Sequence, residues 1–438
     1  MWKRICSIAA ALVLGVSAFG QDGEYLSYTP YSVFGIGNLF GPAPSAYNAG
    51  MAGVGIASRN NRYLNTVNPA AVAVRDSLAL MIDFSLFNTN TVYSQKDGGA
   101  SHISANNATN IGGFAISFPI WNKLSAVAGL RPYSSVGYDF SSSTADADNG
   151  VVSYSSSGMG SLYNVYGGVA VDLWKKLSLG AEADYIFGKI EKNAVQDFSN
   201  SGYNEAQSYK TLTLNAFTGR FGAQYEQKMG KNLRLGLGAT YGLAANIHGY
   251  NDGTFYSAGS VQNMTLPSSY ADTLRADSGI RLAGELGLGI SINYMDRFRA
   301  ELDYTRADWT NSGMDSAKGF SVTDAKQSFA NAVRQGVSLG MEYVPNRNDV
   351  RYYYRRISYR AGAYWHDEYY TVAGRPVNTV GITLGATLPV FRWYNGLSIT
   401  VDAGQRGPFD GSLVRENFVK FTVGVNLFDI WFQQPKYE

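Results

Sequence analysis

Residues 233–243 read LRLGLGATYGL, and this stretch decides the fold class. Apolar side chains occupy every second position from Leu233 to Leu243, while the positions between them hold Arg234, Thr240 and glycines. A repeat of two residues puts an apolar face and a small or polar face on opposite sides of an extended backbone. The stretch therefore predicts a β-strand with one apolar face.

The same alternation recurs along the chain, for example over 163–173, 282–292, 397–403 and 419–427. Strands of soluble sandwiches usually have about five or six residues, whereas a strand that crosses a membrane needs about 9–11. About fourteen such segments can be counted, an even number as in single-chain bacterial barrels. They begin near Leu78, Asn110, Lys123, Ser161, Lys176, Gln207, Lys231, Ser278, Arg297, Val333, Arg355, Pro376, Asn395 and Glu416.

The connections between these segments alternate in length. Long polar loops are expected over 91–109, 140–160, 249–277 and 311–332, with short turns between them. Outer-membrane barrels have short periplasmic turns and long extracellular loops. The tryptophans then fall near strand ends on both sides, as in two interfacial aromatic girdles. The periplasmic set is Trp121, Trp174, Trp393 and Trp431, and the extracellular set is Trp309 and Trp365.

The composition of the chain points the same way. Aromatic residues make up 14% and charged residues only 16% of the sequence, against about 25% charged residues in typical soluble domains. The formal net charge is +2, and Lys3 and Arg4 account for it. This balance gives no reason to expect a nucleic-acid partner.

The N-terminus resembles an export signal. Lys3 and Arg4 precede an apolar run over 8–16 and the small residues Ala18 and Gly20, which predicts a signal peptide over 1–20 rather than a buried helix. The only cysteine, Cys6, lies in that signal. The mature chain is therefore expected to have no disulfide and no thiol nucleophile. Export and strand pattern together predict the cell outer membrane.

Residues 21–77 precede the first predicted strand and are rich in glycine, asparagine and proline. Their low charge and their content of Ile, Val, Phe and Leu argue against a disordered tail. We expect this segment to fill the lumen as a plug. The predicted organisation is a signal peptide (1–20), an N-terminal plug or hatch (21–77), and an all-β transmembrane β-barrel of 14 antiparallel strands (78–438).

The run AGMAGVGIA at 49–57, followed by Asn68-Pro69-Ala70, resembles the N-terminal hatch of the FadL/TodX family of long-chain fatty-acid and aromatic-hydrocarbon transporters. ELDY at 301–304 and DWT at 308–310 look like later strands of that family. The resemblance implies a plugged 14-stranded barrel, a hydrophobic ligand pocket, and a kink in the third strand that opens sideways into the membrane. Close relatives also include the barrel subunit of the type 9 secretion system. The hatch residues expected from the motif are Gly50, Gly53, Gly55, Asn68, Pro69 and Ala70.

A proline interrupts the third predicted strand within the sequence RPYSSVG at 131–137. Proline has no N–H for the ladder, and a barrel has no free edge to accommodate it. Pairing should therefore break near Pro132 and Tyr133. The break is either a lateral opening beside Asn68-Pro69-Ala70, through which an apolar ligand leaves, or a simple bend at an extracellular strand end. Asn68-Pro69 is expected to form a packed hatch turn.

Charged residues of both signs fall on the predicted lumen face, where ion-pair networks that hold the plug are a better explanation than ligand selection. They are Asp83, Asp172, Glu182, Asp184, Arg234, Arg281, Glu285, Arg299, Glu301, Asp303, Glu342, Arg360 and Lys420. Neither a nucleophile elbow nor a zinc-protease motif occurs in the sequence. Asp139, Asp146 and Asp148 are expected to form a solvated acidic loop rather than a calcium site. We expect no catalysis, no metal and no cofactor.

These observations predict a passive outer-membrane transporter of hydrophobic compounds of the long-chain fatty-acid type. Its expected partners are outer-membrane lipid and a hydrophobic small-molecule ligand. The alternative is a non-transporting barrel subunit of an outer-membrane assembly or secretion complex, with other envelope proteins as partners. A general porin is less favoured because of the predicted plug.

Overall fold

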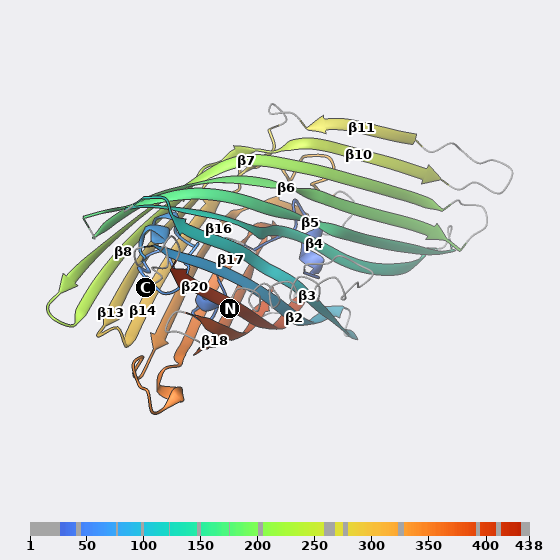
Figure 1. The fold of residues 1–438 in the computed structure, drawn as a ribbon. Helices are drawn as coiled ribbons and strands as arrows, with labels where there is room; N and C mark the ends of the chain where they lie inside the picture. Colours follow the sequence, from blue (N-terminus) through green and yellow to red (C-terminus); the bar gives the residue numbers. More distant parts are fainter. Residues whose placement is uncertain are drawn as a thin grey trace, which may run out of the picture.

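The computed structural model is built almost entirely of β-strands around one lumen (Figure 1). It describes residues 27–40, 45–75, 78–97, 100–121, 123–146, 150–174, 176–199, 205–257, 268–274, 279–322, 328–390, 395–408 and 413–430. The expected signal peptide lies outside these residues. No helix in the described ranges is long and apolar enough to cross a membrane.

Fourteen antiparallel strands form the closed barrel, and β20 pairs with β2 to complete the ring. The strands are β2 (Ala79–Asp97), β3 (Ala100–Pro119), β4 (Leu124–Asp146), β5 (Gly150–Leu173), β6 (Leu177–Phe198), β7 (Ala206–Met229), β8 (Leu233–Gly242), β13 (Glu285–Tyr294), β14 (Phe298–Asp308), β16 (Val333–Tyr343), β17 (Ser358–Val372), β18 (Arg375–Pro389), β19 (Gly396–Arg406) and β20 (Arg415–Ile430). The predicted fold class is confirmed, and each predicted segment corresponds to one of these strands.

Among the described residues, ten shorter elements lie in the lumen, beside the strands or in a turn. They are η1 (Pro30–Val33), β1 (Asn38–Leu39), α2 (Ala46–Ala49), η2 (Pro69–Ala73), β9 (Ala245–Asn246), β10 (His248–Ser257), β11 (Ser268–Leu274), β12 (Arg281–Leu282), β15 (Phe329–Asn331) and η4 (Tyr353–Arg355). β9 and β12 pair only with each other, whereas β10 continues beside β7.

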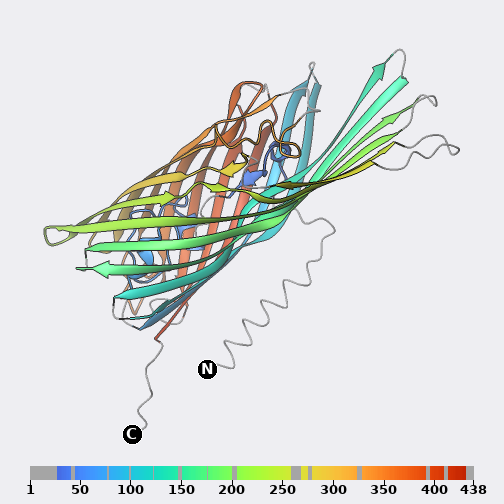
Figure 2. The same cartoon turned by 90° about the horizontal axis from the view of Figure 1, so that it is seen from above.

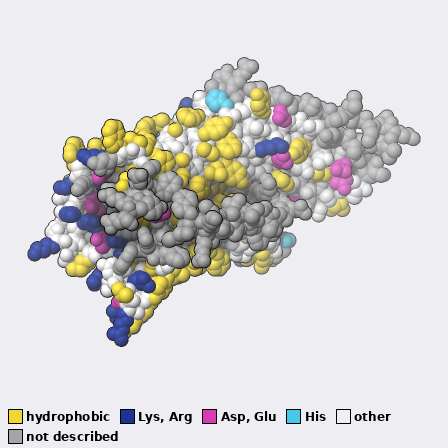
Figure 3. Space-filling model, viewed as in Figure 1, with side chains coloured by type: hydrophobic (Ala, Val, Ile, Leu, Met, Phe, Trp, Pro, Cys, Tyr) yellow, Lys and Arg dark blue, Asp and Glu magenta, His cyan; other side chains and the backbone are white. Residues whose placement is uncertain are grey.

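Side chains on the strands alternate between two environments, as the sequence pattern predicts. On β8, Leu237 is exposed on the outer surface, whereas a Cβ at the neighbouring Gly238 would meet the backbone of Ile56 inside the ring. Outward positions are mostly apolar, and Figure 3 shows them as yellow patches over the strands. Inward positions are small or polar, so the outer surface is the face suited to lipid.

The strands β4 to β7 run well past the rest of the ring, with β10 and β11 beside them (Figure 2). The predicted loops at 91–109 and 140–160 are therefore wrong for most of their length, because they belong to β2–β3 and β4–β5. Their residues are mainly Ser, Thr, Asn and Tyr, which give no hydrophobic alternation, although Thr and Tyr favour strands. Parts of the predicted loop 249–277 likewise form β10 and β11.

The tryptophans follow the girdle pattern only in part. Trp121 and Trp174 are 78% and 77% exposed at the short turns, as expected for an interface. Trp393 and Trp431 lie outside the described residues. Trp309, expected in the extracellular girdle, is instead buried against Tyr369 in an interior cluster. Its placement in a girdle was wrong because the chain after β14 turns into the lumen.

Candidate functional site

The N-terminal segment, residues 27–75, runs through the interior of the ring. η2 contacts β5, β6 and β7, and α2 contacts β18, β19 and β20. Most of the side chains between Ser45 and Ala73 are buried. Figure 2 shows the segment in blue inside the ring of strands.

Glycines on both sides let the segment approach the wall closely. A Cβ on Gly50 would lie 3.2 Å from the Cα of Gly385 on β18. Gly53 adopts φ +77°, a conformation that favours glycine, and its N–H donates to the carbonyl of Asn48 at 3.0 Å. Gly50 therefore allows close backbone packing against the wall, and Gly53 allows the turn that follows α2.

Asn68 caps the turn that begins η2. Its Oδ1 accepts the N–H of Ala70 at 2.9 Å, and its Nδ2 donates to the carbonyl of Ile56 at 2.7 Å. A Cβ on Gly180 of β6 would lie 2.4 Å from the carbonyl carbon of Pro69. Asn68, Pro69 and Ala70 thus form a packed turn against β6 and β7.

Two neighbouring acids of β14 hold the glycine-rich run. Asp303 Oδ2 accepts the N–H groups of Gly55 and Ile56 at 2.8 and 3.0 Å. Glu301 Oε1 accepts the N–H of Ala57 at 2.8 Å. Both carboxylates are buried, so these three bonds satisfy backbone donors that water does not reach.

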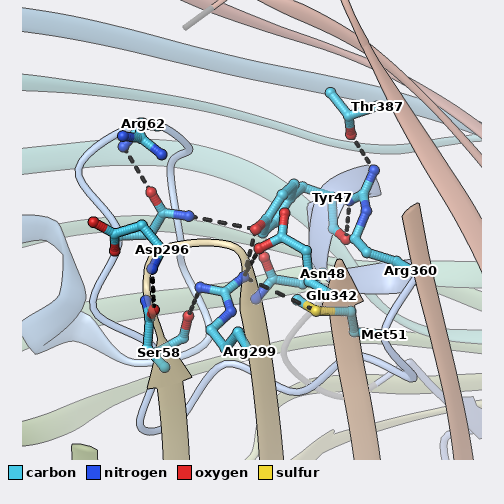
Figure 4. Close-up of polar contacts among 12 residues, drawn as sticks. Tyr47, Asn48, Met51, Ser58, Arg62, Asp296, Arg299, Glu342, Arg360 and Thr387 are labelled. Atoms are coloured by element: carbon cyan, nitrogen blue, oxygen red, sulfur yellow. Dashed lines mark hydrogen bonds and ion pairs between the residues drawn. The ribbon is translucent and has the colours of Figure 1, made fainter. Parts of the chain in front are cut away.

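An arginine cluster on β14 and β17 holds the segment at α2 (Figure 4). Arg299 donates to Ser58 Oγ at 2.7 Å and to the Tyr47 hydroxyl, and it lies 3.2 Å from Glu342. Arg360 donates to the Tyr47 carbonyl, and its guanidinium stacks over the Tyr47 ring at 4.3 Å. Burial raises the pKa of the Tyr47 hydroxyl above its usual range, so this group stays protonated.

A second buried network joins β4, β6 and β7. Arg131 lies 2.6 Å from Glu182 and 2.8 Å from Asp184, and Arg220 lies 2.9 Å from Glu182. Arg220 also donates to the carbonyl of Thr66 at 3.0 Å. The charges predicted on the lumen face thus include many that pack the wall against the N-terminal segment.

The ladder between β3 and β4 stops part-way along the strands. It runs from Pro119–Ser125 to Phe114–Leu130, and outward of this point β3 pairs only with β2. A register shift follows on β4 between Pro132 and Ser134. Pairing therefore ends where the sequence places its proline.

The element beside this gap is β1, not the Asn68 turn. Asn38 and Leu39 pair with Ser135 and Ser134 of β4, and the N–H of Phe40 donates to the carbonyl of Tyr133 at 3.0 Å. An interior cavity of about 340 Å³ lies behind it. Its walls include Asn38, Phe40, Phe87, Gly112, Pro132 and many threonines of the far wall.

A larger cavity of about 820 Å³ lies at the end of the molecule where β4 to β7 project. Tyrosines and serines form much of its wall, together with Lys192 and Lys210. These lysines are direct cross-strand partners on β6 and β7. Lys192 Nζ donates to the carbonyls of Val33 and Gly319 at 2.8 and 3.0 Å. In the described part of the chain, neither lysine has a carboxylate within ion-pair distance.

Comparison with known proteins identifies the family. A family model for BamG matches residues 1–438. The chain belongs to the BamG family. No curated protein matches the chain in sequence.

Solved structures place this BamG family member in the FadL-type fold. The toluene transporter TodX of P. putida matches with a TM-score of 0.60 at 15% identity, covering 92% of this chain and 100% of that one. The Ralstonia pickettii toluene transporter TbuX gives 0.53 at 15%, covering 91% and 98%. A Pseudomonas aeruginosa FadL homologue gives 0.56 at 10%, covering 89% and 98%. At these identities the likeness establishes the fold alone, and at that level the FadL/TodX resemblance holds.

Several residues of the interior networks were not anticipated from sequence. Arg406 binds Glu368 and Glu416 at 3.1 and 3.2 Å, and Arg131 and Arg220 share Glu182. The two residues of each pair lie on different strands, so their spacing in the sequence does not reveal the pair. No group of three or more potential metal ligands occurs in the ranges the structure describes. Of the predicted acidic loop, residues 147–149 lie outside those ranges.

Replacing Asp303 with Ala is expected to loosen the N-terminal segment. Gly55 and Ile56 would each lose the acceptor of a buried N–H, which costs about 1–3 kcal/mol per group. The segment of the folded variant should be cut faster by proteinase K in detergent. Thr305→Ala, on the same face of β14, is the matched control. Equal cutting of the Asp303 variant and this control would show that Asp303 does not hold the segment.

Proposed function

We propose that this chain is an outer-membrane barrel that passively moves hydrophobic compounds of the long-chain fatty-acid type sideways into the membrane. The gap between β3 and β4 carries this proposal. The cavity beside Asn38 is lined by Gly112 and Pro132, next to the place where β3–β4 pairing ends after Leu130, and this supports an exit there toward the lipid-facing side. An apolar compound that leaves here would avoid the aqueous side of the membrane.

The outer cavity supports the choice of an acidic head group. Lys192 and Lys210 are cross-strand partners on neighbouring strands, and an anion between them would stabilise both charges. Two of the three N–H groups of Lys192 are already donated to carbonyls, so Lys210 is the freer cation. Tyr138 and Phe140 stack nearby and offer an apolar wall for a tail.

The two cavities adjoin at Tyr28, which lines both. A compound held in the outer cavity would therefore pass Tyr28 before it reaches the gap. β1 occupies the gap through its two-residue pairing with β4. We infer that β1 must move aside for the compound to leave, and that the rest of the N-terminal segment remains as a plug.

Binding of oleate and of methyl oleate to the purified protein tests this function. Lys210→Met should weaken oleate binding about tenfold or more, because a hydrogen bond to a charged group contributes about 1.5–3 kcal/mol. Methyl oleate, which has no charge, should bind the variant as it binds the parent protein. Lys189→Met is the control, since Lys189 points outward and pairs with Glu191 at 2.5 Å. Unchanged oleate affinity in the Lys210 variant would remove the head-group site.

A second candidate is a non-transporting barrel subunit of an outer-membrane assembly. The many hydrogen bonds from charged wall residues to the N-terminal segment favour it, because such a segment is built to stay in place. Native mass spectrometry of the protein released gently from membranes separates the two. A lone barrel with apolar adducts supports transport, whereas a stoichiometric complex with other envelope proteins supports the subunit role.

A further inference from the structure

The turn between β16 and β17, residues 345–357, exposes a group of arginines and tyrosines. The five residues from Arg351 to Arg355 are all exposed, and Val350 before them is 93% exposed. The turn reaches past the ends of the neighbouring strands, in orange at the bottom of Figure 1. Dark blue Lys and Arg side chains gather at the same tip in Figure 3. We call this segment the arginine–tyrosine turn.

The turn carries an unbalanced positive charge. It holds four arginines and a single acid, Asp349. The Asp349 carboxylate accepts the N–H groups of Arg351 and Tyr352 at 2.9 and 2.8 Å and lies 3.2 Å from Arg355. The Asp349 carboxylate thus binds groups of the turn itself. In the ranges that the structure describes, Arg351 and Arg356 have no carboxylate partner.

Stacking on tyrosine rings fixes the arginines in place. The guanidinium groups of Arg351 and Arg355 lie 5.2 and 4.9 Å from the ring centre of Tyr352. That of Arg356 lies 5.0 Å from the ring centre of Tyr353. A guanidinium held this way loses less freedom when it binds, and its planar fork matches the oxygens of a phosphate.

The arginine–tyrosine turn lies close to the lipid-facing surface of the barrel, which indicates a lipid as its partner. Tyr359 points outward from β17, and its hydroxyl donates to the carbonyl of Tyr354 at 3.0 Å. The hydroxyl of Tyr353 donates to the carbonyl of Pro389 at the end of β18. The turn therefore lies against the lipid-facing side of the strand ends. Outward-facing Tyr294 and Tyr343 mark the same end of the barrel as the interfacial level.

We propose that the arginine–tyrosine turn binds the phosphate head groups of anionic phospholipid in the periplasmic leaflet. Its cations meet the headgroup layer, where each basic residue adds to the attraction for an anionic surface. Its tyrosines suit the boundary between water and hydrocarbon. This proposal rests on the outer-membrane location proposed above, but it is independent of transport.

Native mass spectrometry with added phosphatidylglycerol or phosphatidylcholine tests the site. The triple variant Arg351→Gln, Arg355→Gln, Arg356→Gln should lose affinity for phosphatidylglycerol by about fivefold per arginine. Its phosphatidylcholine adducts should not change. The control removes three exposed cations from other turns and strand ends at this end of the barrel, with Lys176→Gln, Lys228→Gln and Lys231→Gln. It should retain phosphatidylglycerol, and a triple Arg→Lys variant should fall between the two.

Two outcomes would overturn the proposal. One is that the triple Arg→Gln variant binds phosphatidylglycerol as tightly as the parent does, or loses no more affinity than the variant that lacks Lys176, Lys228 and Lys231. The other is a parent protein that binds no phosphatidylglycerol but captures an acidic envelope protein through the same arginines, which would make the turn a protein interface. Loss of oleate binding in any variant bears on the transport proposal only.

Discussion

Deletion of residues 24–72 is expected to turn a closed barrel into an open pore. In the intact chain the described residues of this range meet β6, β7, β14 and β18 from inside, and glycines of the wall touch their backbone. Barrels not much larger than this one leave an aqueous channel when nothing fills the lumen. The variant should therefore conduct ions in a planar bilayer at a level far above that of the parent protein.

The barrel should survive this deletion, because the wall charges can pair with each other once water enters. Arg299 keeps Glu342, and Arg131 keeps Glu182 and Asp184. A variant with a Gly-Ser linker of equal length in place of 24–72 is the matched control. It should also conduct, since a flexible chain cannot reproduce the fitted contacts. A folded deletion variant that stays closed would mean that residues 24–72 are not the plug.

The strand pattern of the membrane part could be predicted because each strand there faces lipid on one side. A strand with one lipid-facing side needs an apolar residue at every second position, as in Leu233–Leu243. The outer halves of β4 and β5 extend past the rest of the ring, and we infer that they are not held to this lipid-facing pattern. The sequence SSSTAD at 141–146 therefore carries no alternation, and its strand is defined only by pairing with 150–155. The boundaries of these strands could not be predicted for this physical reason.

The hatch turn could be predicted from the sequence, whereas the interior networks could not. Asn68-Pro69 is a local signal, because the asparagine cap and the proline at the first helical position act within three residues. The pairing of Arg131 with Glu182 spans 51 positions and two strands. It depends on the register of the whole sheet. Lys192 and Lys210 likewise lie opposite each other because of the β6–β7 register, which cannot be recognised from a sequence motif.

Locking β1 into the gap is expected to abolish uptake of oleate. Asn38 and Ser135 are direct cross-strand partners, so their side chains point to the same side. Cysteines at both positions can form a disulfide, and the only native cysteine is Cys6. Cells that lack their own fatty-acid transporter and produce this double variant should take up oleate only after a reductant opens the disulfide.

A second cysteine pair separates the gap from the rest of the same strand interface. Ser117 and Val127 are partners where β3 and β4 are already paired. A disulfide there leaves the gap unchanged, so uptake should equal that of the parent with or without reductant. If oxidised Asn38→Cys, Ser135→Cys protein still supports uptake, the compound does not leave between β3 and β4. If neither parent nor variants take up oleate while the protein purifies with envelope partners, the barrel acts as a subunit and not as a transporter.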